Sequence, residues 1–269
     1  MRGLENDWQA KAKRVFVIPL MLANAAFVVI GIATGWWGVA VVAAGQVLLF
    51  VLISFQRWRS LNAAPSLVVG AAGVVIAFTQ GTGAIALSLV CFALLLVYVF
   101  WYSPNGRTPS ALLLPGSPLP ELMFADLDGA PVSSSSWAGS ATVLLFYRGT
   151  WCPLCNVQIK ELARGYREIE TLGARVVLVS PQQAEESAKL AARFEAPMTF
   201  LVDENNRSAR RLGIQHPGGA PVGVAAEGET VLPTAVVLDA NGVVRFAHET
   251  DNYRFRPDPA LFLQALRDL

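Results

Sequence analysis

The sequence predicts a multi-pass α-helical membrane domain followed by an α/β domain with a central mixed sheet flanked by helices. Residues 15–55 and 60–106 contain no Asp, Glu, Lys or Arg. In the second half of the chain, short β-prone runs alternate with helical runs, which is typical of an α/β layer. Two cysteines, Cys152 and Cys155, lie where the first buried strand of that layer is expected to pass into a helix.

The composition supports this division. The 269-residue chain is 54% hydrophobic and 15% charged, whereas a soluble protein has about 25% charged residues. Residues 1–106 carry six basic and two acidic side chains; the remainder carries 15 basic and 18 acidic side chains, a net charge of −3. No basic face is concentrated enough to predict a nucleic-acid partner. We expect a membrane domain at 1–103, a linker at 104–118 and a water-soluble domain at 119–269.

Four apolar runs predict four membrane helices, at residues 15–34, 37–55, about 66–79 and 84–102. The first is long enough to cross a hydrocarbon core of about 30 Å. A cleaved signal peptide is less favoured for it, because another apolar run follows almost at once. The runs contain no ionisable Asp, Glu, His, Lys or Arg, which an ion or proton pathway would need. We therefore expect an anchor or packing module; a partner-binding or quinone-facing module is the alternative.

Charge in the loops predicts the orientation. The N-terminal head and the Arg57/Arg59 loop are basic, whereas the two alternate loops are uncharged. Basic loops prefer the cytoplasmic side, so both ends and the soluble domain are expected there. Closely spaced prolines make 104–118 a stiff, extended linker rather than a helix.

The soluble half is expected to contain a short β element at 121–136 and then alternating strands and helices. The predicted strands are 141–147, 175–180, 199–202, 234–238 and 243–247, and the predicted helices are 154–172, 182–194, 206–212 and 259–269. The run Asp239-Ala240-Asn241-Gly242 is a hairpin turn signal. This order predicts parallel pairing that ends in an antiparallel hairpin.

The position of the two cysteines indicates redox chemistry. The first turn of a helix has unpaired N–H groups and partial positive charge, so a thiolate there is stabilised. Pro153 fits that turn, where no N–H is required. A zinc half-site is disfavoured, because zinc needs four ligands and the other candidates are His216, His248 and Cys91. Cys91 is most simply a small buried side chain, and His248 a strand-edge histidine rather than a proton shuttle.

Three separated motifs resemble the peroxiredoxin-like branch of the AhpC/TSA (redoxin) family. They are Phe146 to Cys155 (FYRGTWCPLC), Leu178 to Gln182 (LVSPQ) and Asp203 to Gly213 (DENNRSARRLG). The resemblance covers about 119–269 and implies a thioredoxin-like fold. It also implies peroxide or disulfide substrates, a thioredoxin- or glutathione-like thiol donor, and no bound organic cofactor or metal.

The resemblance leaves the roles of the cysteines open. In the peroxiredoxin motif Thr-x-x-Cys the cysteine attacks peroxide; Cys155 matches that cysteine, with Cys152 in place of the threonine. Thioredoxins instead attack with the first cysteine, which would be Cys152, and resolve with the second. Both versions end in a Cys152–Cys155 disulfide.

Five further residues are expected to support the pair: Arg148, Thr150, Trp151, Pro153 and Pro233. Peroxiredoxins have an arginine just before the strand of the final hairpin, but Leu232-Pro233-Thr234 stands there. Pro233 is similar to the cis-proline of thioredoxins, so we expect a cis bond that presents the backbone of residue 232 to substrate. Arg148 is a candidate replacement cation, with a plain strand-end charge as the alternative. Trp151 is expected to screen the thiols while packing in the core.

The sequence thus predicts a membrane-anchored, thiol-dependent oxidoreductase that reduces peroxides or disulfides through a CxxC dithiol/disulfide cycle. The alternative is a membrane redox sensor or scaffold, in which the state of the CxxC controls a partner without turnover.

Overall fold

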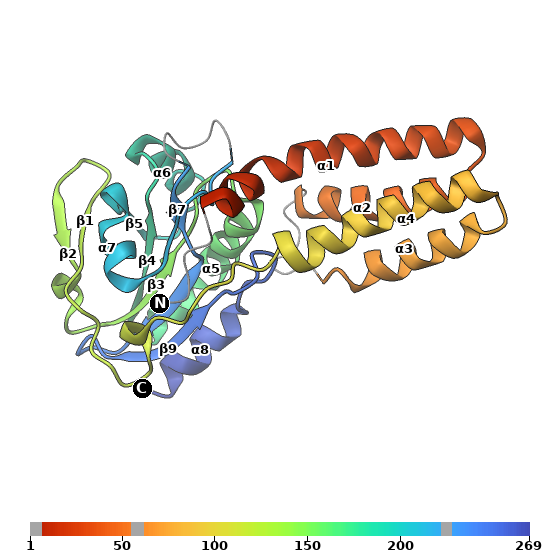
Figure 1. The fold of residues 1–269 in the computed structure, drawn as a ribbon. Coiled ribbons are helices and arrows are strands. Elements are labelled where there is room, and N and C mark those ends of the chain that lie inside the picture. The colour runs from red at the N-terminus through yellow and green to blue at the C-terminus, as the bar shows by residue number, and fades with distance from the viewer. Residues whose placement is uncertain (1–6, 55–61, 222–227) are drawn as a thin grey trace.

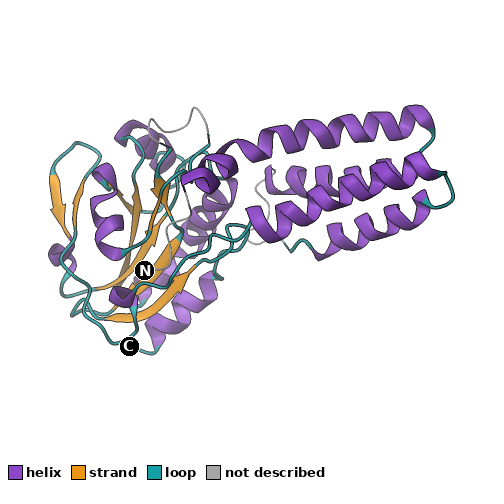
Figure 2. Ribbon diagram, in the orientation of Figure 1, coloured by secondary structure: helices purple, strands orange, loops and turns teal. Residues whose placement is uncertain are grey.

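The computed structural model describes residues 7–54, 62–221 and 228–269, so the predicted Arg57/Arg59 loop lies outside the described residues. Residues 7–54 and 62–102 form an elongated helical bundle that projects from a sheet-containing half (Figures 1 and 2). Its helices are α1 (Asp7–Thr34), α2 (Trp37–Ser54), α3 (Ala64–Ala77) and α4 (Thr82–Val97), and α4 continues into a π-helical turn, Tyr98–Tyr102. The four predicted apolar runs are therefore helical.

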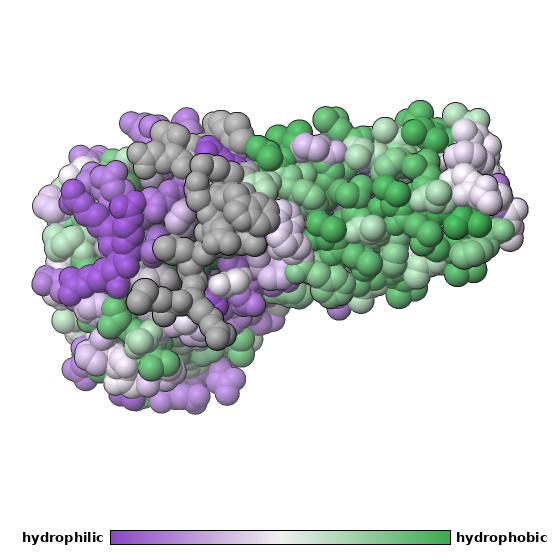
Figure 3. All heavy atoms as spheres, viewed as in Figure 1, coloured by the Kyte–Doolittle hydropathy of each residue, from purple (hydrophilic) through white to green (hydrophobic). Residues whose placement is uncertain are grey.

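The helices differ in how well they suit a membrane. Ala12–Thr34 and Thr82–Tyr102 are long and apolar enough to cross one, whereas the apolar stretches Trp37–Leu52 and Ala64–Ala77 are shorter. The space-filling view shows hydrophobic side chains over most of the visible bundle surface, and hydrophilic ones over the sheet half (Figure 3). Large apolar side chains are exposed along α1, among them Val15, Ile18, Leu22, Val29 and Ile32.

Glycines bring the bundle helices to backbone distance. A Cβ added at Gly31 of α1 would lie 2.6 Å from the backbone nitrogen of Ala40 on α2. A Cβ at Gly38 of α2 would lie 2.6 Å from the backbone nitrogen of Ala77 on α3. Small residues that allow this approach are typical of helix packing in membranes, where side-chain burial gives little drive for association.

The sheet half contains a seven-stranded mixed sheet in the order β2-β1-β5-β4-β3-β8-β9. Strands β3, β4 and β5 pair in parallel and β8 pairs antiparallel with β9, as the sequence predicts. Strand β8 also pairs antiparallel with β3, which the sequence pattern does not predict. The strands are β1 (Met123–Ala125), β2 (Pro131–Ser133), β3 (Ala141–Phe146), β4 (Ala174–Ser180), β5 (Thr199–Val202), β8 (Thr234–Leu238) and β9 (Val244–Glu249). A separate pair joins β6 (Gln215–His216) to β7 (Thr230–Val231).

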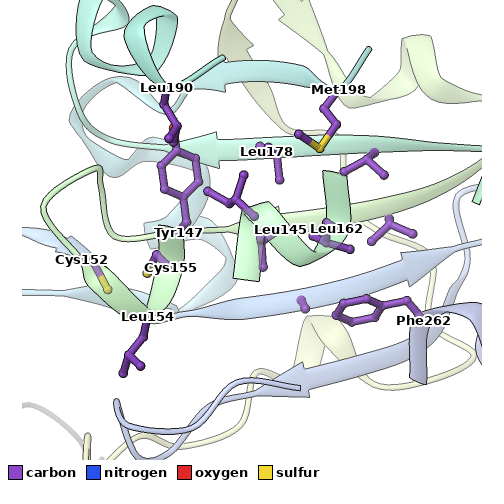
Figure 4. Close-up of a cluster of buried hydrophobic side chains, with 14 of the residues drawn as sticks. Leu145, Tyr147, Cys152, Leu154, Cys155, Leu162, Leu178, Leu190, Met198 and Phe262 are labelled. Atoms are coloured by element: carbon purple, nitrogen blue, oxygen red, sulfur yellow. The ribbon is translucent and has the colours of Figure 1, made fainter. Parts of the chain in front are cut away.

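Helices α5 (Pro153–Thr171), α6 (Ala184–Ala191), α7 (Arg207–Leu212) and α8 (Pro259–Arg267) complete this half. Alternation along β3 divides the core, because successive strand residues point to opposite faces. Val143 and Leu145 join one cluster with Leu162 of α5 and Phe262 of α8, shown in part in Figure 4. Leu144 and Phe146 join the other cluster. The first cluster also contains Leu49, Phe50, Leu95 and Tyr98, so the core continues into the helical bundle.

The proline-rich segment differs from a free linker. Pro104 bridges to Asn252, and Pro118 bridges to Val243. Arg107 forms a buried ion pair with Glu249 of β9. The segment also includes a short 3₁₀ turn, Ala111–Leu113, in which Leu113 is buried. These contacts hold it against β9 and fix the bundle relative to the sheet.

Candidate active site

The two cysteines lie at the start of α5. Cys152 occupies the N-cap position, Pro153 is the first helical residue, and Cys155 completes the first turn. The backbone N–H of Cys155 donates to the Cys152 carbonyl at 3.1 Å. Cys152 is 3% exposed and Cys155 is fully buried. Figure 4 shows both at the same end of the core cluster, with the Tyr147 ring beside them. The two cysteines therefore lie where the chain passes from strand β3 into helix α5, as expected.

Arg256 supplies the positive charge at the thiols. It comes from the segment between β9 and α8, and its Nη2 lies 3.5 Å from Cys155 Sγ and 3.8 Å from Cys152 Sγ. Its Nη1 donates to the carbonyls of Tyr253 and Phe255, each at 2.7 Å, which fixes the guanidinium. Sequence reasoning missed Arg256, because nothing in the run Arg254-Phe255-Arg256-Pro257 indicates which arginine reaches the sulfurs.

The surroundings give the two sulfurs different pKa values. Burial raises the pKa of the Cys155 thiol, but the hydrogen bond from Cys152, the charge of Arg256 and the backbone N–H of Arg148 outweigh it and bring the pKa to about 5. Burial raises the pKa of Cys152 well above its ordinary value, and the neighbouring Cys155 raises it further. At neutral pH this arrangement holds a Cys155 thiolate beside a Cys152 thiol.

Arg148 lies near the thiol pair, and its charge acts to lower the pKa of Cys152. Its guanidinium stacks on the Trp151 ring at 4.6 Å from the centroid, and it donates a hydrogen bond to the Gly219 carbonyl. Its backbone N–H, rather than its charge, supports the Cys155 thiolate. Trp151 is partly buried and packs against the core cluster, as predicted.

The loop between β3 and α5 is held by a tight turn at Gly149 and by a hydrogen bond to Gln182, which follows β4. Gly149 has φ +143, and a Cβ there would lie 2.6 Å from Trp151 Nε1, so glycine is required. The Thr150 N–H donates to Gln182 Oε1 at 2.8 Å. Gln182 Nε2 in turn donates to Ser187 Oγ at 2.9 Å and to Tyr147 Oη at 3.2 Å. Gln182 was predicted to begin a helix, but α6 starts only at Ala184 and leaves it for this network.

The prediction of a cis-proline is wrong. The peptide bond between Leu232 and Pro233 is trans. The Leu232 N–H donates to the Ile214 carbonyl at 2.7 Å, so this amide is already paired within the chain. The Pro233 carbonyl accepts from Arg107 Nη1 at 3.3 Å. Pro233 therefore joins β7 to β8 and lies against the proline-rich segment. His248, on β9, contacts Thr250 Oγ1 through Nδ1 at 3.4 Å, which agrees with a strand-edge histidine.

A cavity of about 330 Å³ lies beside Cys152, between the sheet half and the helical bundle, and we call it the junction cavity. Its sheet-side wall includes Arg148, Trp151, Cys152, Pro153, Leu154, His216, Gly218, Gly219, Pro221 and Tyr253. Its bundle-side wall is Lys13, Arg14, Val17, Ile18, Met21, Phe50 and Tyr102, with Pro104 and Asn105 from the linker. Burial lowers the pKa of His216 to about 3, as do the charges of Arg148 and Lys13, so its imidazole is neutral.

Comparison with known proteins identifies the sheet half. The sequence profile of the AhpC/TSA family matches residues 115–247. Peroxiredoxin Q, chloroplastic, from Sedum lineare is 31% identical over 168 residues, which are 59% of this chain and 84% of that protein. Peroxiredoxin Bcp from Escherichia coli (strain K12) is 26% identical over 99 residues, 37% of this chain and 64% of that protein.

Among solved structures, peroxidoxin BcpB from Mycobacterium tuberculosis superposes with a TM-score of 0.50 at 18% identity. The match covers 60% of this chain and 99% of that one, and it supports the thioredoxin-like α/β fold. The sequence matches show that the chain belongs to the AhpC/TSA family of peroxiredoxins and is a thiol-dependent oxidoreductase.

Proposed function

We propose that the chain is a membrane-anchored thiol peroxidase in which Cys155 attacks the peroxide and Cys152 resolves it. The observation that carries the proposal is the pair of unequal thiols beside Arg256. Cys155 Sγ is the sulfur closer to the guanidinium, and it also accepts the backbone N–H of Arg148. A thiolate is the reactive form of cysteine, so the sulfur with the lower pKa is the nucleophile.

The proposed first step is attack of the Cys155 thiolate on the terminal oxygen of a hydroperoxide. An S–O bond forms as the O–O bond breaks, and the alkoxide takes a proton and leaves as an alcohol, or as water from hydrogen peroxide. Arg256 would stabilise the charge as it moves from sulfur to the leaving oxygen. The product is a Cys155 sulfenic acid.

In the second step the Cys152 thiol attacks this sulfenic sulfur, and water leaves, giving a Cys152–Cys155 disulfide. Two thiol groups of an external donor then reduce the disulfide and become a disulfide themselves. Cys152 lines the junction cavity and Cys155 does not, so Cys152 is the cysteine that a donor thiol in the cavity would attack. Cys155 would leave as the thiolate, and its low pKa makes it the better leaving group. The cycle needs no metal or organic cofactor.

Membrane anchoring through the helical bundle is part of the proposal. Two observations support it. Ala12–Thr34 and Thr82–Tyr102 are apolar and long enough to span a membrane, and glycines allow close contacts among the helices. We propose a domain division at the linker 104–118 and a four-helix, multi-pass arrangement in which α2 and α3 cross a thinned bilayer. The basic N-terminal end of α1 favours the cytoplasmic side for the redoxin domain.

Two substitutions test the roles of the sulfurs. The pre-reduced full chain is mixed with hydrogen peroxide, and one turnover is followed together with trapping of sulfenic acid by dimedone. We expect Cys155→Ser to abolish peroxide consumption. We expect Cys152→Ser to keep one turnover and to accumulate the sulfenic acid. Peroxide consumption by Cys155→Ser with none by Cys152→Ser would reverse the assignment, and consumption by neither the wild type nor the variants would refute the peroxidase.

A further inference from the structure

The segment that holds Arg256 is itself held by the helical bundle. Arg256 Nη1 donates to the carbonyls of Tyr253 and Phe255, each at 2.7 Å. The backbone N–H of Tyr253 donates to the Ser103 carbonyl at 3.2 Å, and its hydroxyl shares a hydrogen bond with the Tyr98 hydroxyl. Tyr98 begins the π-helical turn that ends the bundle, and Ser103 follows that turn. The guanidinium beside the thiols is therefore connected to the bundle through Tyr253.

The last turn of the bundle presents two aromatic rings to Tyr253. The turn Tyr98–Tyr102 is π-helical, and the Ser103 N–H closes it on the Tyr98 carbonyl at 3.0 Å. Such turns are rare and are found frequently at functional sites. The Tyr98 and Tyr102 rings stack with their centroids 5.5 Å apart. Both meet the Tyr253 ring edge-on, at interplanar angles of 82° and 84°, so ring packing and a hydrogen bond together hold this side chain.

The hydrogen bond between the two hydroxyls keeps the same form across the working pH range. Tyr98 is fully buried. Burial raises the pKa of Tyr253 well above its ordinary value, as does the neighbouring Tyr98, so the Tyr253 hydroxyl stays protonated at neutral and acidic pH. An O–H···O bond requires a narrow range of distances and directions. The pair therefore restricts the position of Tyr253 without adding a charge near the thiols.

The ionisation of Cys155 depends on where the guanidinium of Arg256 lies. Its Nη2 is 3.5 Å from Cys155 Sγ, and the attraction between charges weakens as their distance grows. An arginine side chain has many rotamers, so an unsupported guanidinium would spend part of its time away from the sulfur. The carbonyl of Tyr253 restricts this freedom. The other groups that face Cys155, namely Cys152, the Arg148 N–H and Tyr147, belong to the sheet half.

We propose that Tyr98 is a positioning residue for the thiol pair: it holds Tyr253, and Tyr253 holds Arg256 beside Cys155 Sγ. The inference rests on the proposed function, in which Cys155 is the nucleophile. Tyr98 acts through the two residues between it and the sulfur. The last turn of the helical bundle thereby completes the active site, and the reactivity of Cys155 depends on the docking of the bundle against the sheet half.

The test removes the two hydroxyls separately and together. Tyr98→Phe, Tyr253→Phe and the double variant are made in the full chain and studied in detergent micelles. Each single substitution leaves one hydroxyl unpaired, which destabilises the protein, whereas the double variant removes both groups with little change in shape. The pKa of Cys155 is measured from the ultraviolet absorbance of its thiolate. All measurements use a Cys152→Ser background, because the serine hydroxyl can still donate to Cys155.

We expect the midpoint of the Cys155 titration to rise from about 5 by about one pH unit in all three variants. The thiolate fraction at pH 5 should then fall about fivefold. The double variant should shift as much as either single variant, because both substitutions break the same bond. Single-turnover peroxide reduction at pH 5 should slow by less than the thiolate fraction falls, since a thiolate of higher pKa is the better nucleophile.

The matched control is Tyr166→Phe, which removes the hydroxyl of another tyrosine in the same core cluster and should leave the midpoint unchanged. A wild-type midpoint in the double variant would overturn the inference, even with unstable single variants, because a purely structural pair loses stability without a shift. An equal shift in Tyr166→Phe would also overturn it. Either result leaves the peroxidase standing when the unsubstituted chain has a midpoint near 5 and consumes peroxide. A Cys155 that titrates near its ordinary value in that chain would refute both.

Discussion

Two glutamines, one in each half of the molecule, differ in their hydrogen bonding. In the sheet half, Gln182 accepts one hydrogen bond and donates two, and together these fix the loop that leads to the cysteines. In the helical half, Gln46 of α2 is fully buried, and neither its oxygen nor its nitrogen has a partner among the described residues. The helices there pack through glycines such as Gly38.

Polar side chains position the reactive groups in the sheet half, whereas close packing of helices shapes the bundle. The sheet half places charges and hydrogen bonds within a few ångströms of two sulfurs, so that one of them ionises. The bundle supplies close helix contacts and an apolar exterior. In the sheet half, the reactivity of the thiols therefore depends on individual side chains. In the bundle, the apolar exterior depends on the average composition of the helices. Substitutions of matched residues can test this contrast.

The largest effect is expected from Arg256→Met. Without the guanidinium, the pKa of Cys155 should rise from about 5 toward its ordinary value, so the thiol is protonated over most of the neutral range. At pH 6 most of the Cys155 thiol would then be protonated. The greater nucleophilicity of a thiol with a higher pKa offsets only part of this loss. We expect single-turnover peroxide reduction at pH 6 to slow at least tenfold.

The pH dependence of the rate shows whether the pKa of Cys155 is lowered. In the wild type the rate should be constant above about pH 6 and should fall as the pH drops through about 5, because Cys155 becomes protonated there. In Arg256→Met the fall should begin above pH 7. Arg254→Met is the control, since Arg254 is equally buried but donates to Ser103 Oγ at 3.0 Å. The same midpoint in Arg256→Met and wild type would contradict the assigned role.

Arg256 also marks the limit of prediction from sequence. The strand order, the hairpin and the CxxC at a helix start follow from local periodicity and turn signals, because neighbouring residues determine them. Arg256 lies 101 positions from Cys155 along the chain, and only the tertiary path after β9 brings it to the sulfur. The proline-rich segment is similar: its composition predicts extension but gives no sign that it packs on β9.

The prediction for Pro233 failed for a related reason. A proline before the last hairpin resembles a motif, but the pairing of the Leu232 N–H with Ile214 depends on β6 and β7. These two-residue strands are too short to have a periodic signal. The sequence could indicate the two cysteines as candidates for the chemistry, but not which distant groups surround them.

A smaller effect is expected from Gln182→Leu. The substitution leaves the Thr150 N–H without its acceptor and removes the donor to Ser187 Oγ and Tyr147 Oη. Leaving such groups unpaired costs about 1–3 kcal/mol. We expect a lower free energy of unfolding of the sheet half, measured by urea denaturation of the detergent-solubilised chain.

Gln183→Leu is the matched control, because the Gln183 side chain makes no capping hydrogen bond to α6. It should change the free energy of unfolding by less than about 0.5 kcal/mol. A loss of the same size in both variants would mean that the loop does not depend on the Gln182 network.

The smallest effect is expected from Gln46→Leu, and it has the opposite sign. An unpaired buried amide is unfavourable by about 1–3 kcal/mol, and leucine removes it with little change in volume. We expect Gln46→Leu to raise the thermal unfolding temperature of the bundle in detergent micelles. Asn24→Leu should lower it, because Asn24 is equally buried but donates to the Leu20 carbonyl at 2.8 Å and accepts from Cys91 Sγ at 3.4 Å. If both substitutions destabilise the bundle, Gln46 has a polar partner in the bundle, and the contrast between the two halves is smaller than their hydrogen bonds indicate.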